Sequence, residues 1–282
     1  MEAEQRMSKE KIMNEAIKQE QRLTALVEAF KADSADYREI DTPRDEEGKR
    51  RLLRSLMNIR LPRPMAQETL QLQDEYLQAR AAEKGIVSLD EIPPAEGVIS
   101  VWQGDITRLA ADAIVNAANS QMLGCFQPCH SCIDNCIHTF AGVQLRAECG
   151  RRMDELRRRY GRSYEQPTAE PMLTDAYNLP ARKVVHIVGP IVYDRVTPEL
   201  ERELAACYSN TLDLCLENGL RSVAFCCIST GVFRFPKQRA AEIAVQTVRR
   251  WLAGHEGAME RVIFNVFNDK DRERYEQILH SA

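Results

Sequence analysis

The sequence predicts an α/β fold with a mostly parallel sheet, preceded by a segment made only of helices. Short β-branched runs alternate with amphipathic helical patterns from about residue 98 onward, as in sheets that helices cover on both faces. Before Pro93 and Pro94 only helical spacing occurs, so this pair marks a boundary. We therefore expect a helical extension over residues 1–95 and an α/β domain over residues 96–282.

The extension contains three helical patterns. Apolar residues recur three and four positions apart over about 8–30, and the same spacing resumes at Leu52 and again over about 66–84. Gly85 ends the third pattern. We expect these helices to dock on the α/β domain, because their apolar stripes need a surface to cover.

The α/β domain contains five β-branched runs and four helical patterns. In open sheets of this kind, ligands bind beyond the carboxyl ends of the strands, so the residues after each run are the candidates for a site. The runs lie at 98–102, 113–115, 184–188, 223–228 and 262–267, and the helical patterns at about 133–160, 198–218, 236–253 and 269–280.

Composition argues against several classes of partner. The formal net charge of the 282 residues is −4, whereas a duplex-binding protein usually carries a basic surface. No apolar run approaches the roughly 20 residues that cross a bilayer, and the charged N-terminal residues lack the apolar core of a signal peptide. We expect a cytosolic protein with neither nucleic acid nor membrane as partner.

The cysteines are clustered. None of the nine precedes Cys125, and five fall between Cys125 and Cys149. In a chain that does not look secreted, such a cluster favours metal ligands over disulfides. Spacing alone leaves a set of ordinary thiols as the alternative, and it does not choose among the five nearby donors, which are Cys125, Cys129, His130, Cys132 and Cys136.

Polar segments follow four of the runs. Each fits a turn or a helix cap when it is taken alone. A Ser-Thr-Gly sequence before a helix is also typical of loops whose backbone N–H groups hold an anion. The segments are GDIT at 104–107, NAANS at 116–120, STGVF at 229–233 and ND at 268–269.

Taken in order, these segments resemble the macrodomain family. The resemblance includes GDIT, IVNAANS, CIDNCIH, VVHIVGPI and ISTGVFRFP and extends across residues 96–282. It implies a three-layer α/β/α macrodomain with a mixed, mostly parallel sheet, whose ligand is ADP-ribose.

The resemblance also implies a role for each segment. Asp105 would accept a hydrogen bond from the adenine amino group, Asn119 would bind the distal ribose, and the 229–233 loop would surround the diphosphate. Phe267 or Asn268 would cover the adenosine, although Phe267 fits a core position on the last strand equally well. The expected ADP-ribose-binding residues are Asp105, Ile106, Asn119, Ser229, Thr230, Gly231, Val232, Phe233, Phe267 and Asn268.

The cysteine-containing insertion is similar to that of zinc-dependent microbial macrodomains, with the pattern Cys, four residues, His, one residue, Cys. This implies Zn²⁺ as cofactor, held by Cys125, His130 and Cys132. Three protein ligands leave one tetrahedral position open, which is typical of catalytic zinc. Asp134 has two interpretations: it caps the following helix, or it positions or deprotonates a water at the distal ribose.

The chain departs from the family at three positions. Ala169 and Ala176 stand where glycine is usual, so we expect a different local backbone shape there. Arg234 lies between two phenylalanines, where glycine is common. His138 and His186 are interpreted as packing or locally hydrogen-bonded residues.

The expected reaction is hydrolysis of the bond between C1″ of ADP-ribose and an acidic side chain of a mono-ADP-ribosylated protein. Asn119 and Asp134 are the expected catalytic residues. The alternatives are a reader module that binds ADP-ribose without cleavage, and a deacetylase acting on O-acetyl-ADP-ribose. A structural zinc loop in a nucleic-acid-binding protein is a further alternative, which the acidic net charge disfavours.

Overall fold

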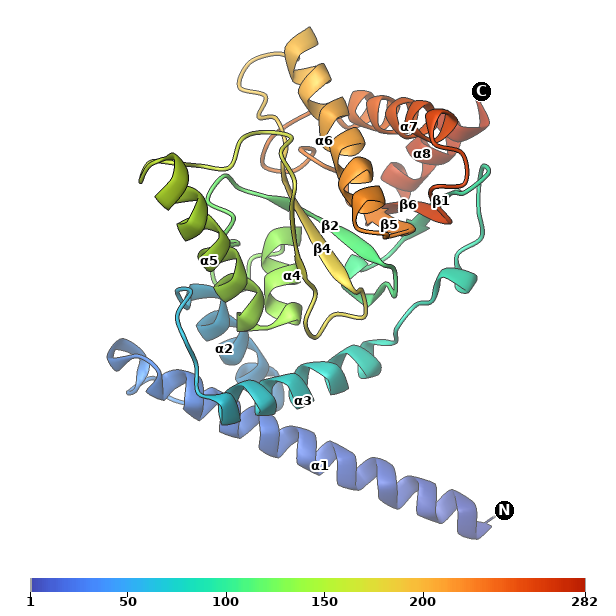
Figure 1. Ribbon diagram of the computed structural model, residues 1–282. Helices are drawn as coiled ribbons and strands as arrows, with labels where there is room; N and C mark the ends of the chain where they lie inside the picture. Colours follow the sequence, from blue (N-terminus) through green and yellow to red (C-terminus); the bar gives the residue numbers. More distant parts are fainter. Residues whose placement is uncertain (1, 282) are drawn as a thin grey trace.

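A six-stranded sheet forms the centre of the molecule (Figure 1) in a computed structural model that describes residues 2–281. The strand order is β1-β6-β5-β2-β4-β3, and all neighbours are parallel except β3 and β4. The strands are β1 (Ile99–Gln103), β2 (Ala113–Ala118), β3 (Met172–Asp175), β4 (Lys183–Val188), β5 (Ser222–Phe225) and β6 (Arg261–Val266).

The central strands are buried on both faces. Every residue of β5 is buried, and so is every residue of β4 except Lys183. Near-continuous burial of this kind requires helices on both sides of the sheet, which confirms the predicted three layers. The helices of this part are α4 (Ile133–Ala141), α5 (Val143–Tyr160), α6 (Pro198–Glu217), α7 (Lys237–Gly254) and α8 (Asp269–His280), with a short 3₁₀ turn, η3 (Ile106–Arg108).

Several sequence-based expectations about the elements were wrong. The helix expected over 133–160 is two helices, because Gly142 adopts φ 97°, which an α-helix does not contain. The strand expected over 223–228 ends at Phe225. Strand β3 was not predicted, since its four residues carry no long apolar run.

The extension forms a second core that is continuous with the α/β domain. Its helices are α1 (Glu2–Ala32), α2 (Glu46–Ile59) and α3 (Gln67–Lys84), with two 3₁₀ turns, η1 (Ala35–Tyr37) and η2 (Leu89–Glu91). Val143 of α5 is buried in the same cluster, so the helices dock on the α/β domain as expected. The other members of this cluster are Leu23, Leu26, Val27, Phe30, Leu53, Leu56, Met57, Tyr76 and Leu77.

Only the second half of α1 takes part in this packing. Met13 and Ile17 belong to the apolar stripe seen in the sequence, yet 59% and 49% of their surface is exposed. Figure 1 shows the first half of α1 projecting beyond the remainder of the chain. None of the helices within residues 2–281 has the length and apolar character needed to cross a membrane.

Candidate functional site

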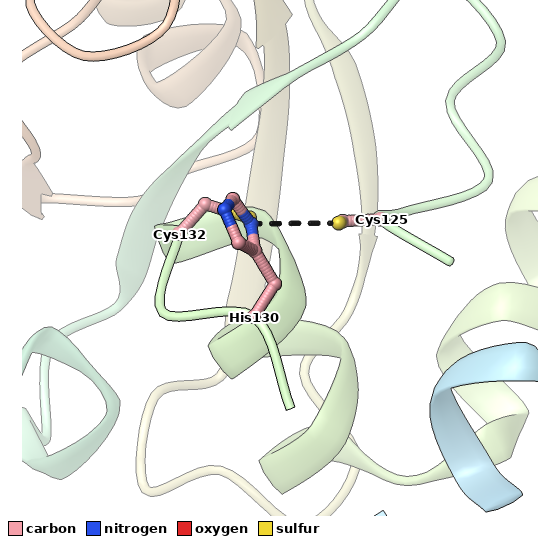
Figure 2. A group of neighbouring side chains, drawn as sticks. All are labelled: Cys125, His130 and Cys132. Atoms are coloured by element: carbon pink, nitrogen blue, oxygen red, sulfur yellow. Dashed lines mark hydrogen bonds between the residues drawn. The ribbon is translucent and has the colours of Figure 1, made fainter. Parts of the chain in front are cut away.

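The three predicted metal ligands lie together. Cys125, His130 and Cys132 belong to the ligand loop, residues 124–132, which is the second part of the connection from β2 to α4. One ligand atom from each residue lies within 4.8 Å of the other two, and Cys125 Sγ is 3.7 Å from His130 Nδ1 (Figure 2). All three side chains are partly exposed. Two thiols and one imidazole at this spacing are a donor set that suits zinc.

The other two cysteines of the cluster face α2. Cys129 Sγ lies 3.3 Å from Ser55 Oγ, and its backbone is left-handed with φ 54°. Cys136 Sγ lies 3.5 Å from Arg54 Nη2. Of the five donors that spacing left open, the geometry therefore groups three and separates two.

Cys132 also begins α4. Its Sγ accepts a hydrogen bond from the Asn135 N–H at 3.4 Å and so acts as the N-cap. The interpretation of Asp134 as the cap was wrong, because Asp134 lies inside the first turn. Burial raises the pKa of the Cys132 thiol to about 12, so binding of a metal at neutral pH must displace its proton.

Asp134 and Asn119, the two predicted catalytic residues, contact each other. Asp134 is buried, and its Oδ2 lies 3.5 Å from Asn119 Nδ2. Asn119 Nδ2 also donates to the Gly124 carbonyl at 3.3 Å, which places Asn119 against the ligand loop. Burial raises the pKa of Asp134 to about 6, so this carboxyl can exchange a proton near neutral pH.

Asn116, which was not among the predicted site residues, donates a hydrogen bond to Asp134. Its side-chain amide donates to Asp134 Oδ1 at 2.8 Å and lies 3.1 Å from His186 Nδ1. His186 Nε2 in turn lies 3.0 Å from Thr174 Oγ1, in agreement with the local hydrogen bonding expected for this histidine. The sequence-based expectation ended this strand at Val115 and placed Asn116 in the segment after it, whereas β2 continues to Ala118.

His138 is the less satisfied of the two core histidines. It is buried, and neither ring nitrogen has a hydrogen-bond partner within the part of the chain that the structure describes. Its Nε2 lies 3.6 Å from Asp134 Oδ1, beyond normal hydrogen-bond distance. Burial holds the pKa of His138 well below its ordinary value, so the ring is neutral at pH values near 7.

The 229–233 loop presents unpaired donors. Within residues 2–281 the backbone N–H groups of Gly231, Val232 and Phe233 donate to no protein acceptor. Val232 is 76% exposed, so these groups are open to a ligand. Helix α7 begins at Lys237, close to the expected start at about 236, so the 229–233 loop precedes that helix and is not its first turn.

Asp105 caps η3 at the end of β1. Its Oδ1 accepts from the Thr107 N–H at 3.0 Å, and its Oδ2 accepts from Lys84 Nζ at 2.9 Å. Burial acts to raise the pKa of Asp105, but the bonds from Lys84 and Thr107 outweigh it and lower the pKa. The neighbouring Ile106 is fully buried in the main core.

Phe267 and Asn268, the last two residues predicted to bind ADP-ribose, differ in exposure and contacts. Phe267 is 80% exposed, so its interpretation as a core residue was wrong. Asn268 is the N-cap of α8, where its Oδ1 accepts from the Asp271 N–H at 3.0 Å. Of the residues that replace glycine, Ala169 and Arg234 adopt left-handed φ values of 63° and 59°, and Ala176 does not.

Comparison with known proteins gives one family. The family model described as Macro domain matches residues 115–244. The chain is 48% identical over 265 residues to a protein-ADP-ribose hydrolase of Treponema medium, covering 93% of this chain and 99% of the relative. It is 42% identical over 261 residues to a protein-ADP-ribose hydrolase of Staphylococcus aureus (strain Mu50), covering 92% and 95%. Both matches are longer than residues 96–282, so they include much of the extension.

Solved structures of macrodomains are also similar to this chain. The Trypanosoma brucei macrodomain in complex with ADP-ribose superposes with a TM-score of 0.61 at 30% identity, covering 79% of this chain and 94% of that chain. The Oceanobacillus iheyensis macrodomain with ADP superposes with a TM-score of 0.57 at 34% identity, covering 67% and 94%.

Proposed function

This chain belongs to the macrodomain family, and from that premise we propose that it is a zinc-dependent hydrolase that removes mono-ADP-ribose from acidic side chains of proteins. One observation carries the proposal most directly. The ligand atoms of Cys125, His130 and Cys132 lie within 4.8 Å of one another. Asn119 and Asp134, the candidates for contact with the distal ribose, adjoin the same loop.

The donor set fits zinc. Thiolate and imidazole ligands suit Zn²⁺ and not the oxygen-seeking Mg²⁺ or Ca²⁺, and three protein ligands leave room for an oxygen of the substrate or of water. When bound, zinc supplies a Lewis acid that polarises such an oxygen. The relatives in Treponema medium and Staphylococcus aureus are named protein-ADP-ribose hydrolases, which supports a hydrolytic role for this chain.

The nucleotide is anchored away from the bond that breaks. The free N–H groups of Gly231, Val232 and Phe233 donate to the diphosphate, and Asp105 accepts from the adenine amino group. The exposed ring of Phe267 covers the adenosine. Binding energy from these remote contacts holds the C1″ end of ADP-ribose in place, so it contributes to the rate of cleavage.

Asn119 and Asp134 act at the distal ribose. Asn119 orients the ribose hydroxyl groups through its side-chain amide. Asp134 as a carboxylate accepts a proton from a water molecule. The hydroxide that remains attacks, and the bond between C1″ and the side-chain carboxyl group breaks. The products are free ADP-ribose and the restored acidic residue.

A turnover assay tests this proposal. The substrate is a protein carrying ADP-ribose on glutamate or aspartate, compared with one that carries it on arginine. We expect release of ADP-ribose from the acidic linkage alone, its loss in the presence of a zinc chelator, and its return when Zn²⁺ is added. Binding without release would identify a reader, and release only from O-acetyl-ADP-ribose would identify a deacetylase. Cleavage that survives the chelator would refute the catalytic zinc.

A further inference from the structure

Helix α2 of the extension is hydrogen-bonded to the ligand loop. Arg54 Nη2 donates to the His130 carbonyl at 2.7 Å and to Asn135 Oδ1 at 2.8 Å. One turn later, Asn58 Oδ1 accepts from the Cys129 N–H at 2.9 Å. The extension therefore contacts the backbone of one candidate zinc ligand, His130, and of the residue before it.

Asn135 extends these contacts to the other half of the loop. This side chain is fully buried, and its Nδ2 donates to the Gln127 carbonyl at 2.9 Å and to the Cys125 carbonyl at 3.4 Å. Its Oδ1 is the acceptor for Arg54. A single guanidinium group thus fixes His130 directly and Cys125 through one intermediate.

The ligand loop depends on such contacts because it has no regular structure of its own. Residues 124–132 contain neither helix nor strand, so no ladder of backbone hydrogen bonds fixes their conformation. Ordering a loop costs conformational entropy, and a loop that is ordered only on metal binding loses that free energy from its metal affinity. Nη2 of Arg54 is the donor to both acceptors, and the planar guanidinium group that carries it is permanently charged, so it can hold His130 and Asn135 at once.

We propose that Arg54 is a positioning residue that preorganises the ligand loop for zinc, so that the extension forms part of the metal site. This inference rests on the proposed function in one respect, namely that the loop binds zinc. It assigns the helices of residues 1–95 a role in the reaction, through the loop and without contact with substrate.

The test measures zinc affinity of the full chain by competition with a chromogenic chelator, with Zn²⁺ alone as the probe. We expect Arg54→Met to weaken zinc binding roughly 10- to 100-fold, the range found when groups that orient metal ligands are removed. Arg54→Lys keeps a charged donor but replaces the planar guanidinium group with a shorter, compact ammonium group, so its zinc affinity should fall between wild type and Arg54→Met. Arg51→Met is the matched control, because Arg51 lies on the same helix with an exposed side chain.

Two further measurements separate positioning from general stability. The affinity for ADP-ribose and the melting temperature of the metal-free protein should change little in Arg54→Met. A parallel loss of all three properties would show a merely structural role and overturn the inference. Wild-type zinc affinity in Arg54→Met would overturn it too, while leaving the proposed function intact. Absence of zinc binding in the wild-type chain would instead refute the zinc part of the proposed function.

Discussion

The ammonium group of Lys84 lies 2.9 Å from Oδ2 of Asp105 and so links the last turn of α3 to the residue expected to recognise adenine. The other carboxylate oxygen of Asp105 accepts from the N–H of Thr107 at 3.0 Å and from its hydroxyl at 2.6 Å. The carboxylate is therefore oriented before a nucleotide binds, and part of the ordering cost of recognition is met during folding.

Asp105→Ala should weaken ADP-ribose binding by about tenfold or more, since it removes an oriented, charged acceptor. We expect the wild-type chain to bind in the micromolar range, about −8 kcal/mol, by isothermal titration calorimetry. AMP serves as the comparison ligand. Equal affinities for AMP and ADP-ribose would contradict a contact between Asn119 and the distal ribose.

Gly231→Glu should nearly abolish ADP-ribose binding without unfolding the protein. A Cβ at Gly231 would meet nothing within 4 Å, so the side chain is accommodated and places a negative charge beside the diphosphate. Gly254→Glu is the matched control, because that glycine also has open space and lies at the end of α7. Calorimetry should show loss of binding in the first variant alone. Loss in both would trace the effect to net charge instead of the loop.

Alanine variants of the three ligands should lose zinc and turnover together. Metal analysis of Cys125→Ala, His130→Ala and Cys132→Ala should show loss of the one zinc per chain expected in the wild type, with turnover reduced by about 10²-fold or more. ADP-ribose affinity should fall far less, because the residues proposed to contact the adenine and the diphosphate lie on other loops.

The matched controls for the ligand variants are Cys129→Ala and Cys136→Ala. Their sulfurs face α2, so both variants should retain zinc. Loss of zinc in either would mean that the loop rearranges on binding. Normal cleavage by the metal-free variants would leave Asn119 and Asp134 as the only catalytic groups.

Asp134→Asn should lower turnover by about 10²-fold or more while leaving zinc content unchanged. Asparagine has nearly the same shape and can still accept the bond from Asn116, but it cannot take a proton from water. A buried carboxyl group is replaced by a neutral amide, so the melting temperature should not fall. Wild-type turnover in this variant would assign proton transfer to another group.

Acid should destabilise the fold through its buried histidines. Burial, assisted by the charge of Arg152, lowers the pKa of His186 to about 3, against an ordinary value of about 6.5. Between these values the unfolded chain binds a proton that the folded chain does not. The free energy of unfolding therefore falls as the pH falls, by up to about 1.4 kcal/mol per pH unit for this group.

Urea unfolding at about pH 7 and about pH 5 measures this effect. His186→Gln should show a smaller difference between the two conditions than the wild type, whatever its overall stability. His280→Gln, which changes an exposed histidine, should keep the wild-type difference. An unchanged difference in His186→Gln would show that His186 is not the group that titrates.

Most strands and helices of the α/β domain follow from the sequence because their apolar residues repeat with the period of the element that they form. The strand β4 and the helix α6 are examples, each found within about one residue of its expected position. The break at Gly142 was missed because helical spacing continues on both sides of it, and one left-handed glycine decides the geometry. The short edge strand β3 depends on pairing with β4, a contact between separate segments.

The residues of the candidate site also divide into those that the local sequence predicts and those that depend on contacts between separate segments. Cys125, His130 and Cys132 share a short segment, so their spacing and family resemblance were sufficient to choose them. Asn116 was assigned to the polar segment after the strand, and nothing in the sequence indicated that its partner is Asp134. Arg54 had no signal, because its contacts with His130 and Asn135 join positions 76 and 81 residues apart.

The order of strands in the sheet also determines what can form first during synthesis on the ribosome. Within residues 2–281, β1 pairs only with β6, so Ile99 cannot pair with Val262 until Val262 has been translated. By contrast, α2, the ligand loop, α4 and α5 all precede residue 161. Cys125, His130 and Cys132 can therefore come together in the nascent chain while β1 still has no partner strand. Under the proposed function, zinc can bind the growing polypeptide before β1 has its partner strand, and until then β1 is an exposed edge strand that is open to non-native pairing.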